Sequence, residues 1–129
     1  MQVEAQEGLT WSNWKQFVQD AEDLGFDGLY RSDHFLTFRP TPERDSLELI
    51  VSLAYAAVHT RRIHIGSRVA PLSFRDPRIL SRQAAALDDL SGSRMVLGLG
   101  TGWQGREHEM FGYELGDASG VRCRGVSRK

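Results

Sequence analysis

Apolar side chains recur every three or four positions from Trp14 to Leu24, a spacing that places them on one face of a helix. Thr10 or Ser12 can cap the start of this helix, and Gly25 stands where a left-handed residue ends many helices. The pattern therefore predicts a first helix that begins just after these caps and stops at the glycine.

Two further helices are predicted by the same spacing and by their first residues. Asp45 and Glu48 have capping-box spacing ahead of a helix whose apolar side is formed by Leu49, Ile50, Leu53, Ala54, Ala57 and Val58. Asp76-Pro77 opens the third helix, because aspartate favours the N-cap and proline favours the first turn. That helix is expected to end at residues 91–92, a Ser-Gly pair.

Four short segments are predicted as strands between these helices. Residues 3–6 form a strand end, and residues 26–32 form a short strand. Residues 61–69 alternate apolar and polar side chains, whereas residues 95–99 are almost continuously apolar, as in a strand buried on both faces. The order of strands and helices predicts an α/β fold with parallel strands.

Right-handed crossovers between parallel strands allow two architectures, an open doubly wound sheet or a (β/α) barrel. A complete barrel of eight strands needs about 250 residues. This chain has 129 residues. With about four strands and three helices, it would therefore supply at most half of a barrel.

Composition and charge narrow the class of protein. The chain is 40% hydrophobic and 26% charged, with a net charge of -1, which excludes a strongly basic nucleic-acid binder. We find no apolar run of membrane-spanning length and no signal-peptide pattern. A single cysteine cannot form an internal disulfide. Together these features predict a cytoplasmic protein that binds neither nucleic acid nor membranes.

The last residues differ from the rest of the chain. Every acidic residue precedes Ala118, whereas residues 118–129 contain four basic side chains and are rich in glycine and serine. This composition predicts one domain over residues 1–117 and a disordered basic tail over residues 118–129.

Candidate chemistry is expected where the strands end, because ligands bind at the carboxyl ends of parallel strands in both architectures. His34, beside Asp33, follows the second strand; such a histidine can donate a proton, bond a cofactor ring or simply bond a loop carbonyl. The glycine-rich segment 98–102 would let a ring or phosphate approach closely, although its spacing is not the dinucleotide-binding fingerprint. Glu107 is interpreted as part of a solvated helix face, and His108 as structural or exposed.

No ligand spacing recurs among the histidines and carboxylates, so no metal site is predicted. One alternative to an enzyme is a nucleotide- or S-adenosylmethionine-binding module built around Gly98–Gly102. It would require that turn to follow the first strand, and the turn follows the fourth. A second alternative, a non-catalytic barrel fragment, shares every fold prediction with the enzyme.

A series of motifs in order resembles the luciferase-like monooxygenase family, which comprises flavin- or coenzyme F420-dependent enzymes on a TIM barrel. The motifs cover about residues 3–117 and are Gly8–Trp11, Ala21–Tyr30, Ser32–His34, Thr60–Gly66, Val69–Pro77, Leu87–Arg94, Leu97–Trp103 and Glu109–Gly112. The resemblance implies a partial (β/α)8 barrel and an oxidoreductase or monooxygenase that uses F420 or FMN and acts on a small organic substrate.

The resemblance also implies roles on the cofactor side of the site. His34 matches the strand-end histidine that lies against the isoalloxazine or deazaflavin ring, as proton donor or ring orienter, with Asp33 beside it. Val69 and Ala70 match a β-bulge behind the ring, which in some members contains a non-prolyl cis peptide.

Further roles follow at the end of the fourth strand. Gly100, Thr101 and Gly102 match the turn that lets the cofactor approach. Trp103 there, together with Phe38 after the second strand, is expected to line the substrate pocket.

The family continues into four more strands and helices, which largely hold the cofactor phosphate site. We therefore expect a truncated N-terminal half, produced by a frameshift or an early stop, that is inactive alone and binds the cofactor weakly or not at all. Its two open strand edges are expected to favour self-association.

Overall fold

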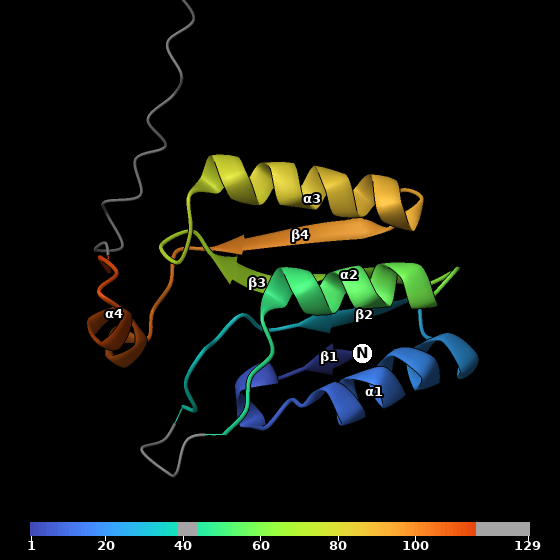
Figure 1. Ribbon diagram of the computed structural model, residues 1–129, viewed down its shortest axis with the longest axis horizontal. Helices are drawn as coiled ribbons and strands as arrows, with labels where there is room; N and C mark the ends of the chain where they lie inside the picture. Colours follow the sequence, from blue (N-terminus) through green and yellow to red (C-terminus); the bar gives the residue numbers. More distant parts are fainter. Residues whose placement is uncertain (39–43, 116–129) are drawn as a thin grey trace, which may run out of the picture.

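The computed structural model describes residues 1–38 and 44–115, in which strands and helices alternate as predicted (Figure 1). The elements are β1 (Gln2–Val3), η1 (Ala5–Glu7), α1 (Trp11–Asp23), β2 (Gly28–Arg31), α2 (Leu49–His59), β3 (His64–Pro71), α3 (Pro77–Ser91), β4 (Met95–Gly100) and α4 (Gly105–Phe111). The first strand is shorter than predicted, because the chain already turns into the 3-10 helix η1 at Ala5. The helix α4 adds a fourth helix to the three predicted.

The described strands form one parallel sheet in the order β1-β2-β3-β4. Leu29 of β2 lies beside Ile65 of β3, which in turn lies beside Met95 of β4. Leu29 and Ile65 are fully buried in one core with side chains of α1, α2 and α3, so the three helices cover the same face of the sheet. An open doubly wound sheet carries helices on both faces, so the fold is the barrel alternative.

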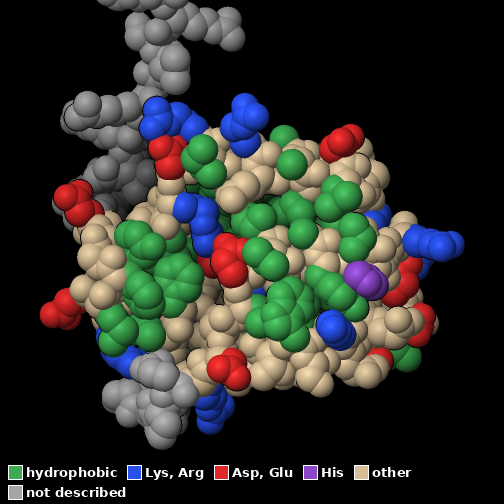
Figure 2. Space-filling model, in the orientation of Figure 1, with side chains coloured by type: hydrophobic (Ala, Val, Ile, Leu, Met, Phe, Trp, Pro, Cys, Tyr) green, Lys and Arg blue, Asp and Glu red, His purple; other side chains and the backbone are tan. Residues whose placement is uncertain are grey.

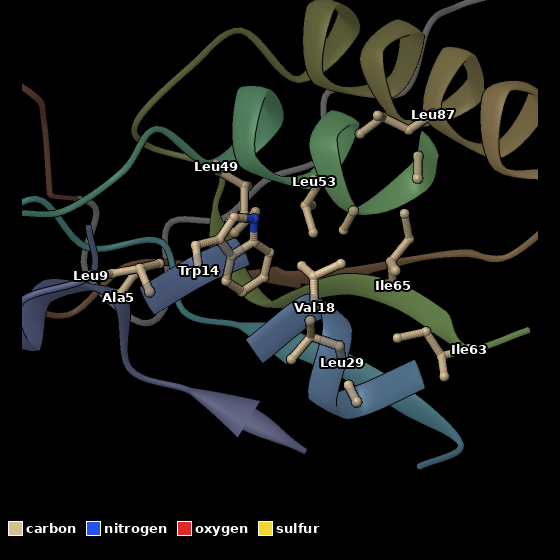
Figure 3. Close-up of a cluster of buried hydrophobic side chains, with 14 of the residues drawn as sticks. Ala5, Leu9, Trp14, Val18, Leu29, Leu49, Leu53, Ile63, Ile65 and Leu87 are labelled. Carbon is tan, nitrogen blue, oxygen red and sulfur yellow. The ribbon is translucent and has the colours of Figure 1, made fainter. Parts of the chain in front are cut away.

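The core between helices and sheet is centred on Trp14. Its side chain is fully buried, and its indole Nε1 donates a hydrogen bond of 2.9 Å to the carbonyl of Ser52 in α2. Figure 3 shows Val18 of α1, Leu53 of α2 and Ile65 of β3 converging beside it. Burying each such aliphatic side chain stabilises the fold by about 2 kcal/mol.

The caps predicted for α1 and α3 are confirmed, whereas the one predicted for α2 is wrong. Glu48, and not Asp45, caps α2, since its carboxylate accepts the N–H of Val51 at 2.8 Å. The buried Arg31 donates to the carbonyl of Leu47 at 2.6 Å and to that of Glu48 at 3.2 Å. These bonds hold the chain extended up to Glu48, so the helix begins only at the next residue.

The strand β3 begins later than predicted, at His64, because the backbone N–H groups just before it are hydrogen-bonded to the side chain of Glu22. Its carboxylate accepts the N–H groups of Arg61 and Arg62, both at 3.0 Å, and that of Ile63 at 3.3 Å. Burial raises the pKa of Glu22, but these hydrogen bonds outweigh it and hold the pKa below its usual value. The end of α1 is thereby fastened to the turn before β3.

Arg94, the residue before β4, fastens the same end of the sheet. Its guanidinium is buried and donates to the carbonyls of Ala57, Thr60, Ile63 and Ser91, at 2.6 to 2.9 Å. These carbonyls lie at or just beyond the ends of α2 and α3. These hydrogen bonds therefore tie the amino ends of β3 and β4 to the ends of α2 and α3.

The helical face also carries exposed apolar side chains, which Figure 2 shows gathered over α2 and α3. Val51 and Val58 on α2, and Ile79 and Leu90 on α3, are each more than half exposed. No helix within residues 1–38 and 44–115 is long and apolar enough to cross a membrane. The predicted basic tail, residues 118–129, lies outside the described residues.

Candidate active site at the strand ends

The carboxyl ends of β2, β3 and β4 lie side by side, with α4 near them (Figure 1). Arg31 pairs with Ser67, and Pro71 pairs with Gly100, so the loops that follow these strands leave the sheet at the same end. The strand-end residues selected from the sequence therefore belong to one region of the molecule.

His34 and Glu107 are in direct contact in this region. The Nδ1 atom of His34 lies 2.8 Å from Oε2 of Glu107. The other carboxylate oxygen, Oε1, accepts the backbone N–H groups of Phe35 at 2.5 Å and Leu36 at 2.9 Å. Glu107 is fully buried, so its interpretation as part of a solvated helix face is wrong: α4 turns this side chain toward three hydrogen-bond donors.

The surroundings of Glu107 favour its ionised form. Burial raises the pKa of its carboxyl, but the hydrogen bonds from His34, Leu36 and Phe35 outweigh burial and hold the pKa below its usual value. At neutral pH the group is therefore a carboxylate, which can only accept hydrogen bonds.

Two aromatic rings, those of Phe38 and Trp103, lie beside the imidazole of His34. The Phe38 ring lies 5.1 Å and the Trp103 ring 5.8 Å from the imidazole centroid, both nearly edge-on, and the two rings are 5.4 Å apart. Phe38 is 45% and Trp103 64% exposed, whereas the His34 side chain is only 12% exposed. The two predicted pocket residues thus contact each other as well as the imidazole and form an open aromatic surface beside it, a surface that suits a flat organic ring.

Asp33 is turned toward the loop after β3. Its buried carboxylate pairs with Arg75, whose second nitrogen lies 3.3 Å from the other Asp33 oxygen and 3.6 Å from Glu48. Burial lowers the pKa of Arg75, but Asp33 and Glu48 outweigh it and raise the pKa above its usual value. The Asp33 carboxylate is therefore occupied within the protein, and contact of this residue with a cofactor stays a prediction.

A β-bulge interrupts β3 at the residues that the resemblance marked. The register with β4 shifts between Ser67 and Ala70, and the Arg68–Val69 peptide bond is cis. Val69 is 43% exposed, whereas Ala70 is fully buried. A Cβ atom on Gly100 would lie 2.6 Å from Cγ2 of Val69, so this glycine makes room for the bulge.

Gly102 faces a hydrogen-bonded pair of side chains. His108 is buried; its Nδ1 donates to the carbonyl of Gln104 at 2.8 Å, so its Nε2 accepts the hydroxyl of Ser73 at 2.8 Å. Gly102 has a φ of +85°, and a Cβ there would lie 2.8 Å from the Ser73 hydroxyl. The glycine is required by the protein's own packing, while Thr101 beside it is exposed. His108 is structural, as interpreted from the sequence.

The side chains present fit the ring of a flavin or deazaflavin better than a metal ion. The imidazole, two open aromatic rings and the exposed Val69 are the groups that contact flat conjugated rings. No cluster of three or more histidine, cysteine or carboxylate side chains that could hold a metal ion occurs in the part of the chain described.

Sequence reasoning missed Glu107 in this region, and it placed Arg75 at the end of the third strand without its pairing to Asp33. The available signal for Glu107 was its place in a short helix directly after the fourth strand. That placement brings its side chain to the end of the sheet where His34 lies.

The luciferase-like monooxygenase family matches residues 1–120 of the chain. Over 105 residues the chain is 35% identical to the pyrimidine monooxygenase RutA of Pseudomonas savastanoi pv. phaseolicola, covering 80% of this chain and 29% of RutA. It is 34% identical over 101 residues to a putative coenzyme F420-dependent oxidoreductase of Mycobacterium tuberculosis, covering 73% of this chain and 26% of that protein. The chain therefore spans less than a third of the length of these relatives.

Solved structures are similar to the fold over most of this chain. The coenzyme F420-dependent tetrahydromethanopterin reductase from Methanopyrus kandleri matches 87% of it with a TM-score of 0.70 and 24% identity, over 29% of the reductase chain. Riboflavin lyase RcaE, solved with modified FMN and riboflavin, matches 89% with a TM-score of 0.73 and 17% identity, over 32% of its chain. The fold is thus a partial luciferase-like TIM barrel, and the chain belongs to the luciferase-like monooxygenase family.

Proposed function

We propose that this chain forms the His34 side of the active site of a flavin- or coenzyme F420-dependent oxidoreductase or monooxygenase that acts on a small organic substrate. The observation that carries the proposal is the imidazole of His34, held by Glu107 and in contact with the rings of Phe38 and Trp103. When bound, the cofactor supplies hydride transfer or oxygen activation.

Other residues of the chain position the cofactor ring. The exposed Val69 supports the ring from the bulge, with the buried Ala70 behind it, and Asp33 anchors the loop that carries His34. The turn Gly100, Thr101 and Gly102 lines the approach to the ring.

The substrate is expected on the open side of the imidazole. Phe38 and Trp103 contact it there through their exposed rings and keep water from the reacting atoms. His34 exchanges a proton with the substrate or orients the ring.

A binding titration tests this proposal on the chain itself. Oxidised FMN and oxidised F420 are added separately to the wild-type chain and to His34→Ala and Trp103→Ala variants, and the ring absorption spectrum is followed. We expect weak binding, with a perturbation that both substitutions reduce. The Trp11→Phe variant is the matched control, because Trp11 lies on α1 and should leave the perturbation unchanged.

Two outcomes would contradict the proposal. One is the absence of any spectral change with either ring at saturating protein, which favours a non-catalytic barrel fragment. The other is binding that is unaffected by His34→Ala and Trp103→Ala. The ring that gives the larger perturbation identifies the cofactor, FMN or F420.

We also propose that the chain self-associates through β1 and β4, the outermost strands of the described sheet. Leu99 of β4 is 50% exposed, and Leu99→Lys places a charge at this edge. Val58→Lys on α2, at 58% exposure, is the matched control. Light scattering after size exclusion should show a lower mass for Leu99→Lys alone. A lower mass for Val58→Lys alone would assign the association to the helical face instead.

A further inference from the structure

The Glu107 carboxylate determines which of the two ring nitrogens of His34 carries the hydrogen. Oε1 already accepts two backbone N–H groups, and Oε2 faces Nδ1 of His34 at 2.8 Å. An ionised carboxylate has no hydrogen to give, so the contact requires a hydrogen on Nδ1. In the neutral imidazole the other nitrogen, Nε2, then carries the lone pair.

Nε2 is the second polar atom of the His34 ring. Within residues 1–38 and 44–115 it forms no hydrogen bond, and its ring is flanked edge-on by Phe38 and Trp103. A ligand that reaches the ring there meets an acceptor, so it must offer a hydroxyl or an N–H group. At Nε2 the neutral imidazole of His34 can only accept a proton, and it can donate one there only when both ring nitrogens are protonated.

We propose that Glu107 is a positioning residue that fixes His34 in its Nδ1–H tautomer, with Nε2 as the hydrogen-bond acceptor of the site. The proposal rests on the proposed function only for the identity of the molecule that meets Nε2. The tautomer itself is a property of this chain without any ligand.

In the Glu107→Gln variant we expect His34 to adopt the opposite tautomer. The backbone N–H groups of Phe35 and Leu36 should keep the amide oxygen, because they can only donate. The amide NH2 group then faces Nδ1 of His34 and donates to it. The hydrogen of the neutral ring consequently moves to Nε2, which becomes a hydrogen-bond donor.

The experiment is long-range ¹H–¹⁵N NMR on the chain labelled with ¹⁵N-histidine, recorded where the imidazoles are neutral. The wild type should give a protonated-type Nδ1 and a bare Nε2 for His34, and Glu107→Gln should exchange the two. Glu109→Gln, at an exposed position of the same helix, should leave both signals unchanged. His108 is an internal reference, because its Nδ1 is held by the carbonyl of Gln104 in every variant.

Either of two results would overturn the proposal. The first is a wild-type His34 that is protonated on Nε2, a result that decides the matter even if Glu107→Gln does not fold. The second is a folded Glu107→Gln, recognised by intact His108 signals, whose His34 keeps the wild-type pattern. Failure of the chain to bind FMN or F420 would count against the proposed function and would leave the tautomer result standing.

Discussion

Arg75 pairs with Asp33, the residue before His34, and thereby joins the loop after β3 to the loop after β2. The Asp33 side chain is 2% exposed and that of Arg75 16% exposed, so water screens the pair only weakly. Removing one partner leaves a buried charge without compensation. The ion pair therefore contributes to the placement of the imidazole as well as to stability.

Asp33→Asn should lower the free energy of unfolding by about 2 kcal/mol, below the range for fully buried pairs because Arg75 keeps some contact with water. Urea denaturation followed by circular dichroism measures the change. Glu7→Gln removes the exposed pair of Glu7 with Arg44, at 3.3 Å, and should cost less than about 1 kcal/mol. Equal effects of the two substitutions would contradict the buried role of Asp33.

Gly102→Ala should destabilise the chain through both its backbone and its neighbours. The left-handed conformation alone costs about 1–2 kcal/mol for a residue with a side chain. Gly25→Ala isolates that cost, since Gly25 has a φ of +82° and no atom within 4 Å of the added carbon. Thermal unfolding should therefore rank the wild type above Gly25→Ala and Gly25→Ala above Gly102→Ala. A reversed order of the two variants would refute the contact with Ser73 and His108.

Trp14→Phe should lower the free energy of unfolding by about 2–3 kcal/mol, because it removes core volume and leaves the carbonyl of Ser52 without its indole donor. Trp11, which is 40% exposed, offers the matched substitution Trp11→Phe. Urea denaturation of the two variants should give a large effect for Trp14 and a small one for Trp11. Similar effects would show that the bond to Ser52 adds little.

The lowered pKa of Glu22 predicts that the stability of the chain depends on pH. Its pKa in the folded chain is lowered, so its contribution is present above the unfolded pKa and is lost as the pH falls through the folded value. Glu22→Gln should therefore be less stable than the wild type near pH 7, with a difference that shrinks below about pH 4. Denaturation at a series of pH values measures it, with Glu109→Gln as the exposed control. A difference in stability between the wild type and Glu22→Gln that grows as the pH falls would contradict the lowered pKa of Glu22.

Most of the fold could be predicted because its signals are local. Thr10 caps α1 with Asn13 three residues away, and Asp76-Pro77 opens α3 within two positions. The choice between barrel and open sheet required knowing which face of the sheet each helix covers, which no local pattern contains. The cap of α2 was placed wrongly because Arg31, 17 residues before Glu48, decides where that helix begins.

The candidate site could be predicted less completely than the fold. His34, Phe38 and Trp103 were selected because each follows a strand, and the structure brings them together. Glu107 was misread because its contact with His34 spans 73 positions along the chain. A carboxylate on a short polar helix resembles any solvated residue until its distant donors are placed beside it.

The hydrogen bonds of Glu22 and Arg94 close the amino ends of the strands, at the opposite end of the sheet from His34. Side chains that hold the scaffold and side chains available for chemistry are thus separated by the length of the strands. Substitutions in the loop that carries Trp103 should therefore leave the hydrogen bonds at the amino ends of the strands intact. Because stabilising residues and strand-end residues lie at opposite ends of the sheet, one scaffold can carry different loops.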